Sequence, residues 1–315
     1  MQQHIEVTHT APARVVKTKD EMKASTFNFL LTLPSMIAIV LVSVIPIVIL
    51  IAISLYHIKP RAGALAVEFI GLANYRFLFG GNDPDFWPSL GRSFLYMSSS
   101  IVFSFLIGLT VALVLNTKIR FVAFFRGITL LPWAMPIVVS AFIWRWILDS
   151  EAGVLNDFLL RMDIIRQPIV WLGTNPWAMI SVIAADVWIR TPLIIIALLA
   201  ALQTIPEDYI EAAMIDGASV VQRFRYIVMP FILPSVYFVL LVSSIFAFRT
   251  FALGFLLTGG GPGHDTYLLV LHMYDTTYKF FEVGRGAALS MTMFFAVVLI
   301  TVFWSLTFRS TLKER

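Results

Sequence analysis

Six long apolar runs, separated by shorter polar segments, divide the chain. Each run is close to, or longer than, the roughly 20 residues that an α-helix needs to cross a membrane. The pattern therefore predicts an all-α, polytopic membrane protein with six transmembrane helices. The expected spans are Phe27–Tyr56, Phe94–Leu115, Phe121–Leu148, Trp177–Leu202, Ile227–Leu257 and Ala287–Phe308.

The two ends of the chain are polar. Residues 1–26 are expected to form one tail and residues 310–315 another, with the transmembrane domain at 27–309 between them. The first apolar run is too long for a signal-peptide core and lacks a small-residue cleavage site, so we expect a retained helix. The third and fifth runs are longer than a straight span needs, which predicts tilt or an interfacial extension.

Composition agrees with a membrane protein. Hydrophobic residues make up 59% of the 315 residues, charged residues make up 13%, and the mean hydropathy is +0.85. A soluble domain carries more charge and fewer apolar residues, so that class is excluded. The absence of cysteine excludes disulfides and thiolate metal sites. The net charge of +4 is modest, and no nucleic-acid partner is expected beside the lipid membrane.

The distribution of lysine and arginine predicts the orientation. With the N-terminus inside, 12 of the 23 basic residues lie on inner segments and 8 on outer segments, the rest lying within spans. This mild excess favours a cytoplasmic N-terminus. Six spans then place both termini and the loop 203–226 on the cytoplasmic side.

The loop 203–226 is predicted to form two short helices joined by an elbow. Pro206 suits the first helical position, and the acidic residues after it favour the positive end of the helix dipole. Gly217 ends the first helix because glycine adopts the left-handed cap without strain. Ser219 and Gln222 have the spacing of a capping box that opens the second helix. On these signals alone, an ordinary membrane loop with helical ends is an equal alternative.

The same loop contains a specific motif, E-A-A-x-x-D-G-A followed by F-x-x-I-x-x-P. Its residues are Glu211, Ala212, Ala213, Asp216, Gly217 and Ala218, then Phe224, Ile227 and Pro230, with Pro234 beyond. This motif resembles the "EAA" loop of permease subunits from binding-protein-dependent ABC importers. The resemblance implies that the first six of these residues belong to coupling helices, which dock into a groove on an ATPase subunit.

Further motifs extend the resemblance over nearly everything from residue 27 to residue 308. The matching residues are Pro132, Pro136, Trp144, Gly153, Asn156, the glycine-rich loop 257–262, and Gly284 and Gly286 at the start of the last span. The pattern is similar to sugar permeases of the first-permease type, like those of the maltose and glycerol-phosphate systems. It implies the fold of a type I ABC importer permease in the bacterial inner membrane, and the import of a sugar, polyol or related solute.

The resemblance also implies the partners. They are a second, homologous permease, two ATPase subunits that bind ATP and Mg, and a solute-binding protein on the outer side. This chain would carry no cofactor and no catalytic residue of its own. An ion-coupled secondary transporter is the alternative, but it predicts inverted repeats and broken spans at matching positions, and neither is evident in the sequence.

Charges within the apolar runs are candidates for function. Asp186 and Arg190 lie four residues apart on one helical face of the fourth span, and Arg249 lies in the fifth. Charges at this depth are costly, so they are expected to face a cavity or a partner. Two interpretations remain open and are compatible: a structural ion pair, or side chains that line the permeation path.

The resemblance to the maltose permease implies a set of substrate-binding residues. The matching positions are Asp186, Ile189, Arg190, Leu193, Ser243, Phe246, Ala247 and Thr250. Arg190 and Ala247 replace small or amide side chains of the maltose system, so recognition is expected to differ from that of maltose. Phe246 would either stack on a sugar ring or pack in the core.

The remaining motifs do not support a phosphate-binding loop, a metal site or a catalytic site. The segment 259–263 is glycine-rich, but no lysine follows at the spacing of a phosphate loop, so a tight outer turn is the better interpretation. The five histidines lie in tails and outer loops without ligand spacing, which indicates no metal site. No serine, histidine and aspartate grouping suggests an enzyme.

Overall fold

The computed structural model describes residues 24–61, 64–117 and 120–313, and most of the expected N-terminal tail lies outside them. The chain divides into two compact units, residues 1–49 and 50–315. The first unit contains α1 (Ala24–Ile39), a π-helical segment (Val40–Val44) and the start of α2 (Ile45–Ser54). None of its described side chains from residue 28 to residue 49 is buried. A continuous apolar surface is what a helix immersed in lipid presents.

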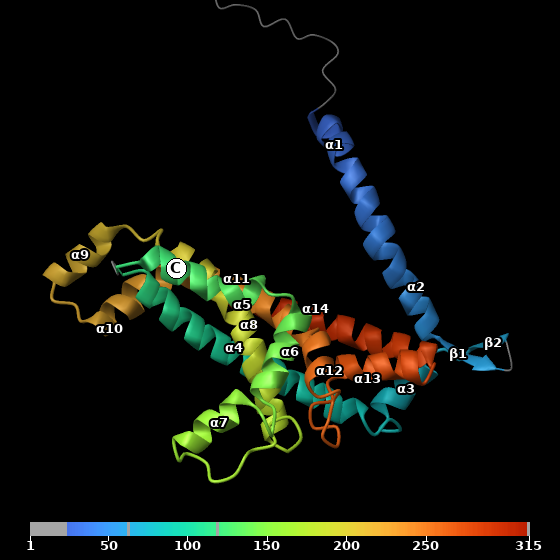
Figure 1. Cartoon of the computed structure of the whole chain (residues 1–315). Helices are drawn as coiled ribbons and strands as arrows, with labels where there is room; N and C mark the ends of the chain where they lie inside the picture. The colour runs from blue at the N-terminus through green and yellow to red at the C-terminus, as the bar shows by residue number, and fades with distance from the viewer. Residues whose placement is uncertain (1–23, 62–63, 118–119, 314–315) are drawn as a thin grey trace, which may run out of the picture. The chain divides into compact units, whose positions relative to one another are not determined.

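The second unit is built on four long helices, α4 (Phe86–Leu115), α8 (Trp177–Leu202), α11 (Met229–Phe248) and α14 (Val283–Lys313) (Figure 1). The closest packing joins α4 to α8. At Gly108, a Cβ atom would lie 2.8 Å from a methyl group of Ile194, so only glycine allows this approach. The core forms two clusters, one around Tyr96 and Leu289 and the other around Leu198 and Ile232.

Shorter elements connect and cap these helices. They are α3 (Ala73–Phe79), α5 (Val122–Ala134), α6 (Ile137–Ile147), α7 (Val154–Arg161), α9 (Glu207–Ile215), α10 (Val220–Arg223), α12 (Ala252–Leu257), α13 (Leu269–Tyr274), and the π-helical segments Phe224–Val228 and Asp275–Lys279. Within this unit, α9 and α10 lie at one end of the long helices, and α3 and α13 lie toward the other (Figure 1).

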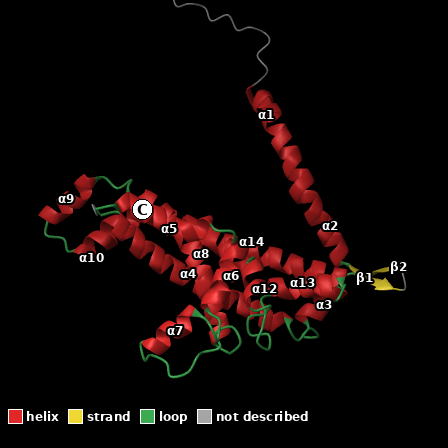
Figure 2. Cartoon of the chain, viewed as in Figure 1, coloured by secondary structure: helices red, strands yellow, loops and turns green. Residues whose placement is uncertain are grey.

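Two strands form a hairpin that the sequence analysis did not predict. β1 (Tyr56–Arg61) pairs antiparallel with β2 (Ala64–Phe69), with Tyr56 opposite Phe69 (Figure 2). The hairpin is tied to the start of α14 by an ion pair between Lys59 and Glu282. Outside this hairpin, the regular structure of the described residues is helical, so the all-α class is confirmed with one small addition.

The third expected span, for which the length predicted tilt or an interfacial extension, is instead broken into two helices. α5 and α6 meet at an angle of 97°. Met135, between them, has an extended backbone (ψ 137°) and is followed by Pro136. Proline disfavours the helical conformation of the residue before it, and this effect separates the two helices. Among the described residues this is the one bent pair of apolar helices.

The fifth expected span is also shorter than its apolar run. α11 ends at Phe248, and α12 begins only at Ala252, so Arg249 caps the helix and does not lie within it. Its side chain is exposed. At the C-terminus, α14 continues to Lys313, past the expected start of the tail. With the bent pair counted as one span, the described residues contain six candidate membrane spans, which agrees with the predicted number.

Candidate functional site

The loop after α8 forms the predicted elbow. α9 ends at Ile215, and Gly217 has a left-handed backbone (φ +77°). The amide of Ala218 then donates to the carbonyl of Ala213 over 2.8 Å, which closes the helix end. Satisfying the last carbonyls of a helix through a left-handed glycine is a common way to stop it. The first part of the elbow is therefore determined by Gly217.

The second part of the elbow begins with the predicted capping box. The hydroxyl of Ser219 accepts from the amide of Gln222 (3.3 Å), and the Gln222 side chain accepts from the amide of Ser219 (2.7 Å). The chain then continues from α10 through the π-helical segment into α11 without a break. Pro206 lies at the N-cap of α9, one position earlier than predicted.

The elbow carries large apolar side chains that the rest of the described chain leaves uncovered. Ile215 is 87% exposed, Val220 71% and Val221 73%. Glu211 and Asp216 are also exposed. Exposed apolar side chains grouped with charges are typical of a protein interaction surface.

A second group of polar side chains lies within the helix bundle. The guanidinium of Arg190 donates to both carboxylate oxygens of Asp186, over 2.6 and 3.0 Å. It also donates to the hydroxyl of Thr250 over 3.4 Å. The side chains of Arg190 and Asp186 are only 11% and 5% exposed. The predicted ion pair is therefore present, and the structure adds Thr250 to it from a distant part of the sequence.

The other expected substrate-binding residues have differing environments. Ser243 and Ala247 are buried, and the hydroxyl of Ser243 has no hydrogen-bond partner among the described residues. Ile189 and Leu193 are half-buried, and Ile189 packs against the core. Phe246 is 57% exposed. Tyr96 of α4, which the sequence analysis did not single out, is fully buried within electrostatic range of Asp186 and Arg190.

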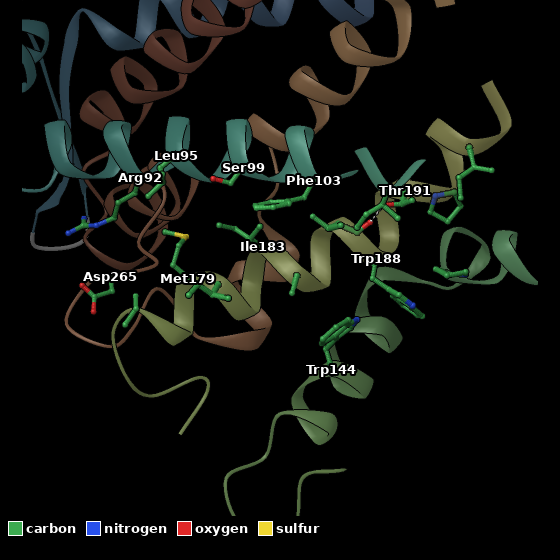
Figure 3. Close-up of a pocket in the computed structure, with 18 of the residues that line it drawn as sticks. Arg92, Leu95, Ser99, Phe103, Trp144, Met179, Ile183, Trp188, Thr191 and Asp265 are labelled. Atoms are coloured by element: carbon green, nitrogen blue, oxygen red, sulfur yellow. Dashed lines mark hydrogen bonds between the residues drawn. The ribbon is translucent and has the colours of Figure 1, made fainter. Parts of the chain in front are cut away.

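An apolar cavity of about 1080 Å³ lies on another face of α8, between α4, α5 and α6 (Figure 3). None of the eight expected substrate-binding residues lines it. Trp144 and Trp188 meet edge to face at its wall, with ring centroids 6.1 Å apart. The cavity and the Asp186–Arg190 pair are thus separate features.

Polar contacts order the loops at the end of the second unit away from the elbow. His272 and Asp83 are joined over 2.9 Å, and both are nearly buried. Burial acts to raise the pKa of Asp83, but the hydrogen bond and charge of His272 outweigh it and hold that pKa below its usual value. Asn156 accepts from Trp171 Nε1 (2.9 Å) and binds both the amide and the carbonyl of Ile169. Asn156 therefore holds the loop after α7.

These features define a class of protein. The second unit is a bundle of membrane-spanning length with a structured elbow at one end and a buried charged pair inside. No group of three or more metal-ligating side chains occurs in the described part of the chain. The arrangement is that of a helical membrane protein with an exposed apolar surface at the elbow.

Comparison with known proteins identifies the family. Residues 104–309 match the model of the family described as "Binding-protein-dependent transport system inner membrane component". The sulfoquinovosyl glycerol transport system permease protein SmoG of Agrobacterium fabrum is 33% identical over 272 residues, covering 86% of this chain and 87% of that protein. The trehalose/maltose transport system permease protein MalF of Thermococcus litoralis is 32% identical over 285 residues, covering 90% and 94%. The chain belongs to this family and is a permease subunit of an ABC importer.

Solved structures agree on the fold. A bacterial ABC transporter involved in the import of the acidic polysaccharide alginate has a chain that matches with a TM-score of 0.76. The match covers 91% of this chain and 96% of that chain at 19% identity. A methionine ABC transporter, MetNI, matches with a TM-score of 0.52 over 72% of this chain and 98% of that one. The fold is that of a type I importer permease, as predicted.

Proposed function

We propose that this permease subunit imports a sugar, polyol or related solute that a solute-binding protein delivers. The names of the relatives support the solute class: SmoG is named for sulfoquinovosyl glycerol and MalF for trehalose and maltose. Both proteins match most of this chain. The import would be driven by ATP, with no catalytic residue on this chain.

The observation that carries the proposal is the elbow. Gly217 and the capping box set the angle between α9 and α10, while Ile215, Val220 and Val221 are exposed around the joint. A rigid joint with an apolar surface can transmit the motion of a partner to α11, because α10 continues into that helix. The residues proposed for docking are Glu211, Ala212, Ala213, Asp216, Gly217 and Ala218.

The proposed assembly contains four kinds of chain. A second, homologous permease would pair with this one, and two ATPase subunits holding ATP and Mg would dock on the two elbows. The solute-binding protein would approach the opposite end, where Asp83, His272 and Asn156 order the loops. Both termini would lie in the cytoplasm of a bacterium.

The solute would bind along α8 and α11. We propose Asp186, Ile189, Arg190, Leu193, Ser243, Phe246, Ala247 and Thr250 as its contacts. The Arg190 guanidinium already satisfies Asp186 and approaches Thr250, so it is positioned to donate to a hydroxyl or anionic oxygen of a bound solute. The free hydroxyl of Ser243 would supply a further polar contact.

The test is solute uptake by the complex reconstituted in proteoliposomes. ATP should drive uptake, and a proton or sodium gradient without ATP should not, which distinguishes an ABC importer from an ion-coupled secondary transporter.

Glu211→Lys should abolish ATP-driven uptake while the subunit still inserts, because it reverses a charge on the docking surface. Glu68→Lys, an exposed change in β2 outside both proposed partner surfaces, is the matched control. Wild-type uptake by Glu211→Lys would contradict docking at this loop.

The orientation is tested separately. A reporter fused after Gly217 should be cytoplasmic, and reporters after Gly80 or Asn156 should be external. An external reporter at Gly217 would remove the elbow from the reach of any ATPase.

A further inference from the structure

The apolar cavity of Figure 3 has an uneven distribution of charge. Its long wall is apolar, formed by α4 and α8, with Leu95, Phe103 and Ile183 among the lining residues. Its two charged lining residues, Arg92 and Asp265, lie at one end of the row, and Trp188 and Thr191 lie at the other (Figure 3). The cavity is thus an apolar groove, and we call its charged end, formed by Arg92 and Asp265, the mouth.

The two charges at the mouth do not neutralise each other directly. Among the described residues, neither Arg92 nor Asp265 has an ion-pair partner within 4.0 Å. The Nη1 atom of Arg92 is buried and has no hydrogen-bond partner in the same residues. The other guanidinium nitrogens of Arg92 are not buried and also lack a hydrogen-bond partner among the described residues, so they are the atoms that an oxygen of a ligand in the groove would meet.

We propose that this groove binds a phospholipid whose headgroup carries both a phosphate and a primary ammonium, as in phosphatidylethanolamine. The phosphate would accept from Arg92, which suits phosphate oxygens through its forked donors. The ammonium would donate to Asp265. An acyl chain would lie along the wall from Leu95 to Ile107.

The dimensions fit one leaflet of a bilayer. Twelve residues separate Leu95 from Ile107, which is about 18 Å along a helix. Half of the hydrocarbon core of a bilayer is about 15 Å. Arg92 lies on the second turn of α4, at the end of the helix away from the elbow, so the charged mouth corresponds to a headgroup region.

The chemistry of the wall argues against the transported solute as the occupant. Beyond the mouth, hydroxyl groups are few, those of Ser99, Thr129 and Thr191, whereas a sugar needs many polar partners. Thr191 already donates to the carbonyl of Val187 over 2.6 Å. An apolar chain with a zwitterionic end matches both parts of the groove.

The experiment measures lipid retention by native mass spectrometry. The full-length chain is reconstituted in bilayers with equal amounts of phosphatidylethanolamine, phosphatidylglycerol and phosphatidylcholine of the same acyl chains, and the lipids that stay bound are counted. Phosphatidylethanolamine should be enriched about tenfold over phosphatidylcholine, which corresponds to one charge-assisted hydrogen bond. Phosphatidylglycerol, which lacks the ammonium, should lie between them.

Variants separate the two parts of the headgroup. Arg92→Gln should lower retention of all three phospholipids by about tenfold, because each of them carries the phosphate that Arg92 would bind. Asp265→Asn should lower phosphatidylethanolamine to the level of phosphatidylglycerol. Arg166→Gln and Asp163→Asn, at exposed residues outside the groove, are the matched controls and should change nothing.

A third variant tests the groove without touching a charge. Ala184→Trp places an indole in the groove and should reduce retention of all three lipids, whereas Ile196→Trp, on an exposed part of α8 outside the groove, should not.

Equal retention of the three lipids by the wild-type chain, or unchanged retention in Arg92→Gln, would overturn the proposal. A photocrosslinker at position 184 in the intact complex should capture lipid. Capture of a neighbouring permease helix in its place would also overturn it.

Discussion

The elbow and the buried ion pair are both held by hydrogen bonds between residues close in sequence, yet they have opposite surroundings. The bonds that shape the elbow, Ser219 with Gln222 and Ala218 with Ala213, join residues three to five positions apart. The Asp186–Arg190 pair is equally local, but it acquires Thr250 from 60 residues away and is shielded by the packing of several helices. The elbow presents its side chains outward, whereas the pair depends on its surroundings for stability.

This contrast predicts where mutations act. A change at the elbow should leave the bundle intact and affect the communication with a partner. A change at the buried pair should affect folding first, because a lone charge within the bundle has no water to solvate it.

The largest effect is expected for Asp186→Ala. Removing one partner of a buried pair leaves the other uncompensated, which typically costs about 3–5 kcal/mol. We expect a strong loss of folded, inserted subunit, measured by the thermal midpoint of the purified chain. Asp157→Ala is the matched control, because Asp157 and Arg161 form an exposed pair at the same spacing and should change stability little.

The double variant Asp186→Ala with Arg190→Ala distinguishes a structural role from a role in transport. Stability should return, since no unpaired charge remains. If the pair contacts the solute, uptake should stay low while the ATPase activity of the complex remains. Full uptake with unchanged affinity would remove both residues from the proposed solute site.

A smaller effect on stability, but a large one on coupling, is expected for Gly217→Leu. No neighbouring atom lies within 4 Å of a Cβ at this position, so the cost comes from the left-handed backbone alone, about 1–2 kcal/mol. The joint should change its angle, and ATP hydrolysis should continue without uptake. Gly217→Asn should retain most of the coupling because asparagine tolerates this conformation. Equal coupling in both variants would show that the angle at Gly217 is unimportant.

Ser219→Ala should have a milder effect on the same elbow. Loss of an N-cap costs about 1 kcal/mol and should loosen the start of α10. Hydrogen exchange at the amide of Gln222, which Ser219 caps, should become faster, and Ser219→Thr should restore its protection. An unchanged exchange rate would mean that the cap does not hold the helix in solution.

The smallest effect is expected for Glu282 and depends on pH. Burial acts to raise the pKa of Glu282, but the hydrogen bond from Lys59 and the charge of Arg285 hold that pKa below its usual value of 4.5. The stability that its carboxylate contributes is therefore fully present above about pH 4.5 and is lost as the pH falls through the lowered pKa. The thermal midpoint of the wild type should exceed that of Glu282→Gln at pH 7, and the difference should shrink below about pH 4. Glu68→Gln, at an exposed residue of β2, should show no such trend.

Much of the fold could be predicted because lipid imposes a simple rule on the chain. Every span must be a long apolar helix, so the apolar runs indicate the spans directly. The ends of the helices were less predictable. α4 begins at Phe86, eight residues before its expected start at Phe94. The added segment is helical but contains polar residues, so it does not belong to the apolar run. Hydropathy detects contact with lipid, and a helix that extends beyond the membrane leaves no such signal.

The sequence by itself determined the elbow, the number of spans and the pairing of Asp186 with Arg190, since each depends on residues within a few positions of one another. Only the tertiary structure decided the meeting of Arg190 with Thr250 and the ion pair that ties the β1–β2 hairpin to Glu282. It also decided that Arg92 and Asp265 share the mouth of one groove. The physical reason is range: helix caps and i,i+4 pairs arise from local backbone geometry, whereas a groove or a contact between helices arises only when distant segments pack.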